Sequence, residues 1–203
     1  ITYQGLHCVI TGNTLMHTGD IGIYVQPNHY QDGTSATISG NRIEKPTVGP
    51  GIYLQLMNAK SSGAINHGMF AVTGNNIDKP DEDDGVCVYV YKNNAETTVK
   101  GVTITGNTIL NNDYHGIYVR GYADASGDRM ENVAIVGNNF HTTKTDYTGV
   151  VGIYFYRAEN CIANSNIITG VNSPNIGIRI NTSTNITYAN NMINGYNTDT
   201  YVG

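Results

Sequence analysis

Carboxylates and a histidine gather in front of two similar short segments of the chain. Asp81 to Asp84 precede a Gly-Val-Cys-Val segment, and Asp113 and His115 precede a Gly-Ile-Tyr-Val segment. Two carboxyl groups about 5 Å apart fit retaining hydrolysis of a glycosidic bond, and a separation of about 6.5–9.5 Å fits inverting hydrolysis. We expect Asp83 or Asp84 to pair with Asp113, the more desolvated carboxyl acting as the acid. The sequence leaves the distance between the two carboxyl groups open.

A second chemistry is open to His115, Tyr118 and Arg120, which lie within one short segment. A base such as Tyr118 or His115 could remove the proton beside a uronate carboxylate while Arg120 neutralises the developing enolate. That reaction is the one catalysed by a polysaccharide lyase. The catalytic candidates of the two hypotheses together include Asp83, Asp84, Asp113 and His115.

The sequence indicates no cofactor. Asp83, Asp84 and Asp113 offer hard oxygen ligands, so calcium is an alternative use for them, but no loop has EF-hand spacing. The three cysteines, at positions 8, 87 and 161, form neither a CxxC pair nor a disulfide framework. We expect free thiols and no metal.

Composition bounds the class of protein. The 203 residues are 39% hydrophobic and 13% charged, which is typical of one domain with a buried core. A formal charge of −5 lacks the basic surplus of a nucleic-acid binder, and no apolar run approaches the roughly 18 residues of a membrane span. Helix is disfavoured by 24 glycines and few good helix formers. We therefore expect neither nucleic acid nor membrane as a partner.

A bend motif, aliphatic-x-Gly-Asn-x-aliphatic, repeats along the whole chain. Its asparagine recurs every 25 to 34 residues, at positions 13, 41, 75, 107, 138, 166 and 191. Short alternating segments flank each bend, and no helical segment could return the chain for a βαβ unit. The repeat predicts an all-β, right-handed parallel β-helix of about seven coils and three short parallel sheets. Stacked at one corner, the asparagine amides are expected to bond from coil to coil.

A second repeated segment, of the Gly-Ile-Tyr-Val type, places a row of side chains on the outer face of one sheet. With its aliphatic residues inside, alternation turns tyrosines outward on most coils and places Cys87 and Arg179 in the same outward row. Amphipathic rings flanked by amides and arginines suit sugar rings. The predicted substrate-binding residues are Tyr24, Tyr53, Tyr89, Tyr118, Arg120, Tyr154 and Tyr156.

These two motifs, clearest from Val102 to Val119, resemble the repeats of the pectate-lyase-like parallel β-helix family. The resemblance spans the chain and is specific for the fold. It implies a ligand cleft along the outer face of the Gly-Ile-Tyr-Val strands. Among family members the chain is most similar to bacteriophage tailspikes, because its coils are irregular and rich in asparagine, threonine and glycine.

A tailspike would be a homotrimer on the virion tail, extracellular, that binds a bacterial capsule or O-antigen polysaccharide and cleaves it. The resemblance thus implies a depolymerase, which the carboxylates favour as a glycoside hydrolase. A free polysaccharide lyase or epimerase and a non-catalytic adhesin or structural solenoid are the alternatives. Residues 1–203 are expected to form a single β-helix domain. Both ends fall inside repeat segments without a cap, which predicts a fragment of a longer chain.

Overall fold

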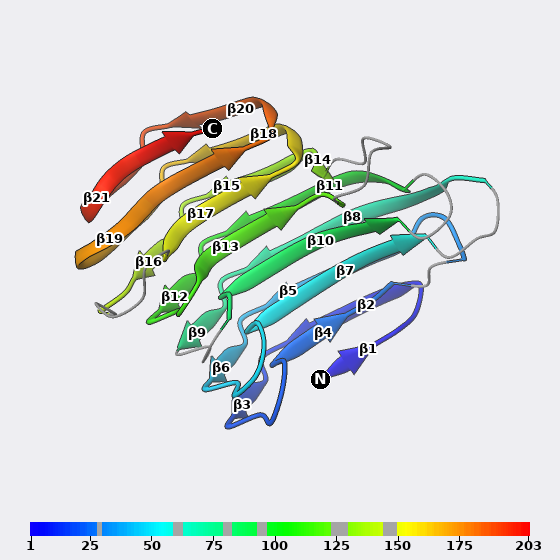
Figure 1. Cartoon of the computed structure of the whole chain (residues 1–203). Helices are drawn as coiled ribbons and strands as arrows, with labels where there is room; N and C mark the ends of the chain where they lie inside the picture. The colour runs from blue at the N-terminus through cyan, green and yellow to red at the C-terminus, as the bar shows by residue number, and fades with distance from the viewer. Residues whose placement is uncertain (28–29, 59–62, 79–82, 93–96, 123–129, 144–149) are drawn as a thin grey trace.

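The computed structural model of the chain describes residues 1–27, 30–58, 63–78, 83–92, 97–122, 130–143 and 150–203. Regular structure in these ranges consists of β-strands, and each strand pairing is parallel. The strands form three stacks, and each coil of the chain contributes a strand to each stack in turn (Figure 1). The predicted parallel β-helix is therefore confirmed.

The stacks are named here by their place in the coil. Stack A contains β1 (Thr2–Tyr3), β4 (Ile23–Val25), β7 (Ile52–Asn58), β10 (Val86–Lys92), β13 (His115–Arg120) and β17 (Val151–Tyr156). Stack B contains β2 (His7–Thr11), β5 (Ser35–Ser39), β8 (Ile65–Thr73), β11 (Thr97–Thr105), β14 (Met130–Glu131), β15 (Val133–Val136), β18 (Ala158–Asn164) and β20 (Thr184–Ala189). Stack C contains β3 (Thr14–Met16), β6 (Arg42–Glu44), β9 (Asn76–Asp78), β12 (Thr108–Leu110) and β16 (Asn139–His141).

The last two coils differ from the expected three short strands. β19 (Ile167–Asn181) runs without a break from stack C into stack A, and β21 (Met192–Val202) pairs with it in parallel. Stacks A and C therefore join into one hydrogen-bonded sheet at this end. The reason is that the connection from the stack C strand to the stack A strand is short in these coils. It lacks the insertions that separate these strands in the other coils. The register shifts twice along the pair, as a bent continuous strand requires.

The asparagine ladder at the corner between stacks B and C is confirmed. The side chain of Asn75 shows the pattern: its Nδ2 donates to Asn107 Oδ1 at 2.9 Å in the next coil and to the Ile38 carbonyl at 3.0 Å in the previous one. The backbone N–H of Asn75 donates to the same Asn107 oxygen at 2.9 Å. The ladder thus satisfies backbone groups that the bend leaves outside the strand pairing.

The residue before each ladder asparagine adopts a left-handed backbone. Gly106 has φ +63° and open space where a Cβ would lie, whereas Ser165 occupies the equivalent position at φ +55°. We expect Gly106→Ala to lower the free energy of unfolding by about 1–2 kcal/mol through backbone strain alone. Ser165→Gly relieves this strain, but glycine also widens the unfolded ensemble, so the free energy of unfolding should rise by only about 0.5 kcal/mol. Urea unfolding measures both changes relative to the wild type. Two variants of equal stability would contradict strain in the left-handed backbone.

A glycine precedes the repeated inward aliphatic residue in the stack A strands from β4 to β17 and allows the coils to pack closely. A Cβ on Gly85 would lie 2.4 Å from Ile109 Cγ2 and 2.6 Å from the carbonyl oxygen of Gly116. The repeated glycine is therefore required by the packing of stack A against stack C. The glycine also sets the position of the residues that immediately precede it, because they lie where the chain enters stack A.

The core between the stacks is apolar, with isoleucine, valine and phenylalanine side chains of all three stacks at or near zero exposure. Because strand residues alternate, the side chains between them face outward. In the described ranges no helix is long and apolar enough to cross a membrane.

Candidate functional site

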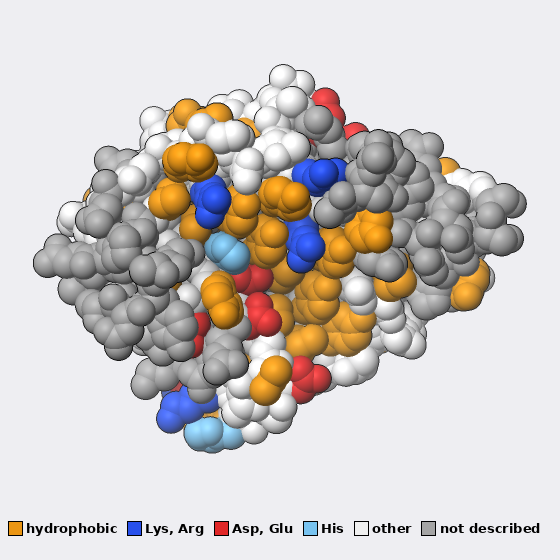
Figure 2. All heavy atoms as spheres, in the orientation of Figure 1, with side chains coloured by type: hydrophobic (Ala, Val, Ile, Leu, Met, Phe, Trp, Pro, Cys, Tyr) orange, Lys and Arg blue, Asp and Glu red, His pale blue; other side chains and the backbone are white. Residues whose placement is uncertain are grey.

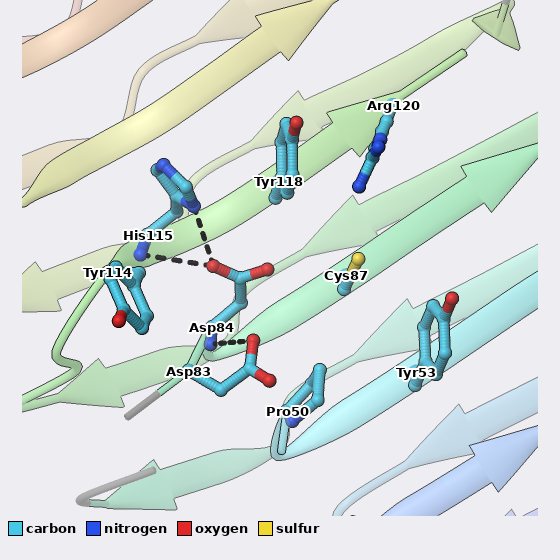
Figure 3. A pocket seen from close by; sticks show the side chains of 9 residues that line it. All are labelled: Pro50, Tyr53, Asp83, Asp84, Cys87, Tyr114, His115, Tyr118 and Arg120. Carbon is cyan, nitrogen blue, oxygen red and sulfur yellow. Dashed lines mark hydrogen bonds and ion pairs between the residues drawn. The ribbon is translucent and has the colours of Figure 1, made fainter. Parts of the chain in front are cut away.

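A pocket of about 300 Å³ opens on the outer face of stack A, over β7, β10 and β13. Figure 2 shows this face, where apolar and aromatic side chains are bordered by acidic groups, a histidine and basic groups. The close view in Figure 3 shows carboxylates at one end and a guanidinium at the other. The lining residues are Pro50, Tyr53, Asp83, Asp84, Cys87, Tyr114, His115, Tyr118 and Arg120.

Asp84 and His115 form the most tightly bonded contact in the pocket. Asp84 Oδ1 lies 2.6 Å from His115 Nδ1, and it also accepts the His115 backbone N–H at 3.2 Å. Only 6% of the Asp84 side chain and 16% of the His115 side chain are exposed. Both residues directly precede the repeated glycine, so the register of β10 and β13 brings them together. The contact holds one carboxylate oxygen fixed and leaves the other directed away from the histidine (Figure 3).

Asp83 lies beside Asp84 and has a different electrostatic environment. Its Oδ1 accepts the Asp84 backbone N–H at 2.8 Å. Burial raises the pKa of Asp83 to about 6, and the neighbouring Asp84 charge adds to the rise, against smaller opposing contributions from the backbone hydrogen bond and His115. Asp83 therefore keeps its proton at mildly acidic pH, as a general acid must.

The pair of carboxyl groups that the pocket brings together is thus Asp83 with Asp84, two consecutive residues. Asp113, which the sequence predicted as their partner, is buried at 3% exposure and is not among the residues that line the pocket. Asp81 and Glu82 lie outside the described residues. No group of three or more His, Cys, Asp or Glu residues in the described part of the chain is arranged to hold a metal ion.

The outward row of stack A follows the predicted register. Tyr24 pairs with Tyr53 in neighbouring strands, and Tyr118 pairs with Tyr154. The rings of the first pair stack with centroids 5.4 Å apart, and those of the second pair are 5.0 Å apart. Cys87 occupies the same row between the two pairs. Tyr53, Cys87 and Tyr118 border the pocket, while Tyr24 and Tyr154 continue the row on either side.

Arg120 forms the basic end of the pocket. Its guanidinium carbon lies 4.8 Å from the centre of the Tyr89 ring and 6.0 Å from that of Tyr118. In the described chain Arg120 has no acidic partner, and its Nε is buried without a hydrogen bond. Further along the row, Arg179 lies 5.0 Å from the Tyr154 ring centre and, among the described residues, likewise has no acidic partner. Two cations on this face are therefore available to an anionic ligand.

The remaining predicted binding residue, Tyr156, follows Tyr154 in β17 and pairs with Arg120 across the strands. Burial raises the pKa of Tyr53 and of Tyr118 well above the ordinary phenol value. Both phenols therefore stay protonated, which makes them hydrogen-bond donors and disfavours Tyr118 as the base of a lyase reaction.

Sequence reasoning missed three lining residues, Pro50, Cys87 and Tyr114, and also the contact between Asp84 and His115. The signal for that contact was present, because the two residues hold the same position before the repeated glycine. Cys87 was recognised as an outward residue, but only the ring contacts reveal it as an interruption between stacked tyrosines. Pro50 and Tyr114 lie in the corners before stack A, whose course no repeat predicts.

Fold and pocket together define the class: a parallel β-helix with a pocket of carboxyl, tyrosine and arginine side chains on one sheet. No protein-family model, curated protein or solved structure matches this chain. The functional argument therefore depends on the chemistry of the pocket.

Proposed function

We propose that the protein is a glycoside hydrolase that binds a polysaccharide on the outer face of stack A and cleaves it in the pocket. The observation that carries this proposal is the pair Asp83 and Asp84. One carboxyl group keeps its proton to about pH 6, and its neighbour is held by His115. Glycoside hydrolysis uses two carboxyl groups, one of which donates a proton, and the separation of the two groups distinguishes its retaining from its inverting form.

In this mechanism Asp83 donates its proton to the glycosidic oxygen as the bond from that oxygen to the anomeric carbon breaks. Asp84 is the second carboxyl group of this mechanism and would act through the oxygen that does not contact His115 Nδ1. Water adds its hydroxyl to the anomeric carbon, and its remaining proton passes to the carboxyl groups, while the other product keeps the proton that Asp83 donated. The configuration of the first product tells whether Asp84 activates water or attacks the sugar itself.

The cations favour an acidic polysaccharide as the substrate. Arg120 borders the pocket without an acidic partner in the described chain, and bidentate pairing of a guanidinium with a carboxylate is strong. The same Arg120 also serves the alternative of a lyase, which needs a uronate. The raised pKa of Tyr118 disfavours it as the base of this alternative, whereas His115 is bonded to Asp84 through Nδ1 and would act there through Nε2.

The family resemblance extends the proposal to a tailspike-type protein, a homotrimer outside the cell on a virion tail, whose substrate is a bacterial capsule or O-antigen. The outer face of stack B has an uncharged central row that is suited to contact between copies. Its central row contains Val9, Thr37, Ala71, Thr103, Ala134, Ile162 and Thr187. Sedimentation equilibrium measures the association, and a monomer at micromolar concentration would remove the homotrimer from the proposal.

The test of the activity is incubation with purified polysaccharides, followed by mass analysis and NMR of the products. The panel pairs acidic chains (polysialic acid, hyaluronan, alginate) and capsule and O-antigen preparations with neutral chains (dextran, mannan). We expect saturated oligosaccharides from an acidic chain, fastest below about pH 6, because Asp83 must be protonated. Products with a new double bond would establish a lyase instead. Binding without cleavage across the panel would leave a recognition protein.

A further inference from the structure

The stacking of the tyrosines limits where a sugar ring can lie. Tyr24 and Tyr53 cover one face of each other, as do Tyr118 and Tyr154, and the rings of the second pair are nearly parallel, with 8° between their planes. Arg179 lies over the Tyr154 ring as well. Within each pair, the contact between the rings leaves no space for a sugar. A polysaccharide that followed the row along the solenoid would therefore meet mostly ring edges.

The row of tyrosines is interrupted at Cys87, and the gap between the tyrosines on either side is wide enough for one ring. Strand neighbours lie about 4.8 Å apart, so Tyr53 and Tyr118, one strand to either side of Cys87, are separated by about 10 Å. A ring packed between two others needs about 7–8 Å, twice a van der Waals contact, which leaves room for a puckered sugar. Cys87 forms the floor of this slot, with 7% of its surface exposed. Burial raises the pKa of its thiol, so the floor is a small neutral group.

The two ends of the slot have opposite charge. Along β10, Asp84 precedes Cys87 by three residues and Tyr89 follows it by two. Arg120 extends over Tyr89 at the second end, and Asp83 with Asp84 borders the first. Figure 3 shows this order, with the carboxylates on one side of Cys87 and Arg120 on the other.

We propose that the absence of a tyrosine at position 87 creates a subsite for a single sugar ring, which inserts between Tyr53 and Tyr118. The glycan then crosses stack A along β10 at this point and does not follow the solenoid axis. This inference rests on the proposed function for its ligand class, a sugar, and places the bond to be cleaved at the Asp83 and Asp84 end. A ring carboxylate would lie at the Arg120 end.

Filling the slot is the decisive change. Cys87→Tyr adds the missing ring in a row where β7 and β13 already have tyrosine, and Cys87→Ser is the matched control that keeps the size and the donor. The probes are the methyl glycosides of glucuronate and galacturonate, with those of glucose and galactose as neutral partners. Saturation-transfer NMR measures their binding without any cleavage. We expect transfer to the acidic probes in the wild type and the serine variant, and at least a tenfold loss with Cys87→Tyr.

Two further variants keep the test decisive. Tyr53→Leu removes one wall without adding a ring, so it should also weaken probe binding if Cys87→Tyr does not fold. Tyr188→Ala removes an exposed tyrosine of β20 in stack B, away from the slot, and should leave monosaccharide binding within twofold. Thermal unfolding establishes that each variant is folded.

The outcomes separate this proposal from the hydrolase. Retained probe binding in both Cys87→Tyr and Tyr53→Leu would overturn the slot, even if the wild type cleaves a polysaccharide. The absence of transfer to any of the four probes in the wild type would overturn it as well. Probe binding that is lost in Cys87→Tyr, in a wild type that cleaves nothing on the polysaccharide panel, would support the slot and remove the hydrolase.

Discussion

Replacing Asp83 with asparagine is expected to lower kcat on the cleaved polysaccharide by about 10²–10⁴-fold, the usual contribution of a general acid. Asparagine keeps the size of the side chain and can still accept the Asp84 backbone N–H, but it has no proton to deliver. Binding of the polysaccharide should change little. Initial rates and KM, measured at pH 5.5, test this expectation, since a loss in KM alone would point to a binding role.

The matched control is Asp20→Asn. Asp20 holds the same position as Asp83, two residues before the repeated glycine, but it lies outside the pocket lining. Its replacement should leave kcat within about twofold, as is usual for an exposed group away from the chemistry. An equal loss in the two variants would show that the carboxylates act through the general charge of this face.

The pH profile gives an independent measure of the same group. The pKa of Asp83 is raised to about 6, so kcat/KM in the wild type should fall as the pH rises through about 6. The folded state binds this proton more tightly than the unfolded chain does. Ionisation of Asp83 therefore lowers the free energy of unfolding as the pH rises from about 4 to 6. The side chain introduced by Asp83→Asn cannot ionise and avoids that cost. The variant should therefore stay folded at pH 7, and lost activity could not be attributed to unfolding.

The fold was predictable because each coil repeats the same physical constraints. The asparagine that bonds between coils recurs at each bend, a glycine that tolerates a left-handed backbone precedes it in most of them, and alternation then assigns the outward residues. What the repeat could not predict is where a connection is too short to form a corner. β19 and β21 are continuous for that reason.

The site was predictable only in part. Alternation placed Tyr53, Cys87 and Tyr118 in one outward row, whereas the contact of Asp84 with His115 was missed, although the two residues hold the same position before the repeated glycine. Ring orientation depends on side-chain rotamers, which a sequence pattern does not contain, so stacking of the tyrosines on one another was not foreseen. The position of Asp113 depends on the course of a corner, where the period of two is lost, and its burial away from the pocket lining followed from no motif.

The largest effect on stability is expected from Asn138→Ala, in the middle of the ladder. Asn138 is 1% exposed, and its Oδ1 accepts both the backbone N–H and the side-chain amide of Asn107 at 2.9 Å. Its Nδ2 donates to the Ile104 carbonyl at 2.9 Å and to Asn166 Oδ1 at 3.0 Å. Alanine would leave these buried groups without their partner, each at a cost of about 1–3 kcal/mol. We expect a loss of at least about 3 kcal/mol in the free energy of unfolding.

The next residue provides the control, because Asn139 carries the same side chain on an exposed position of β16. Its backbone N–H donates to the Asn107 carbonyl at 2.8 Å, a bond that alanine keeps. Asn139→Ala should therefore change the unfolding free energy by less than about 0.5 kcal/mol in urea. Similar losses at 138 and 139 would contradict a ladder that stabilises the corner. A large difference would instead mean that the corner between stacks B and C fixes the stacking of the coils, and with it the register that sets Asp84 beside His115.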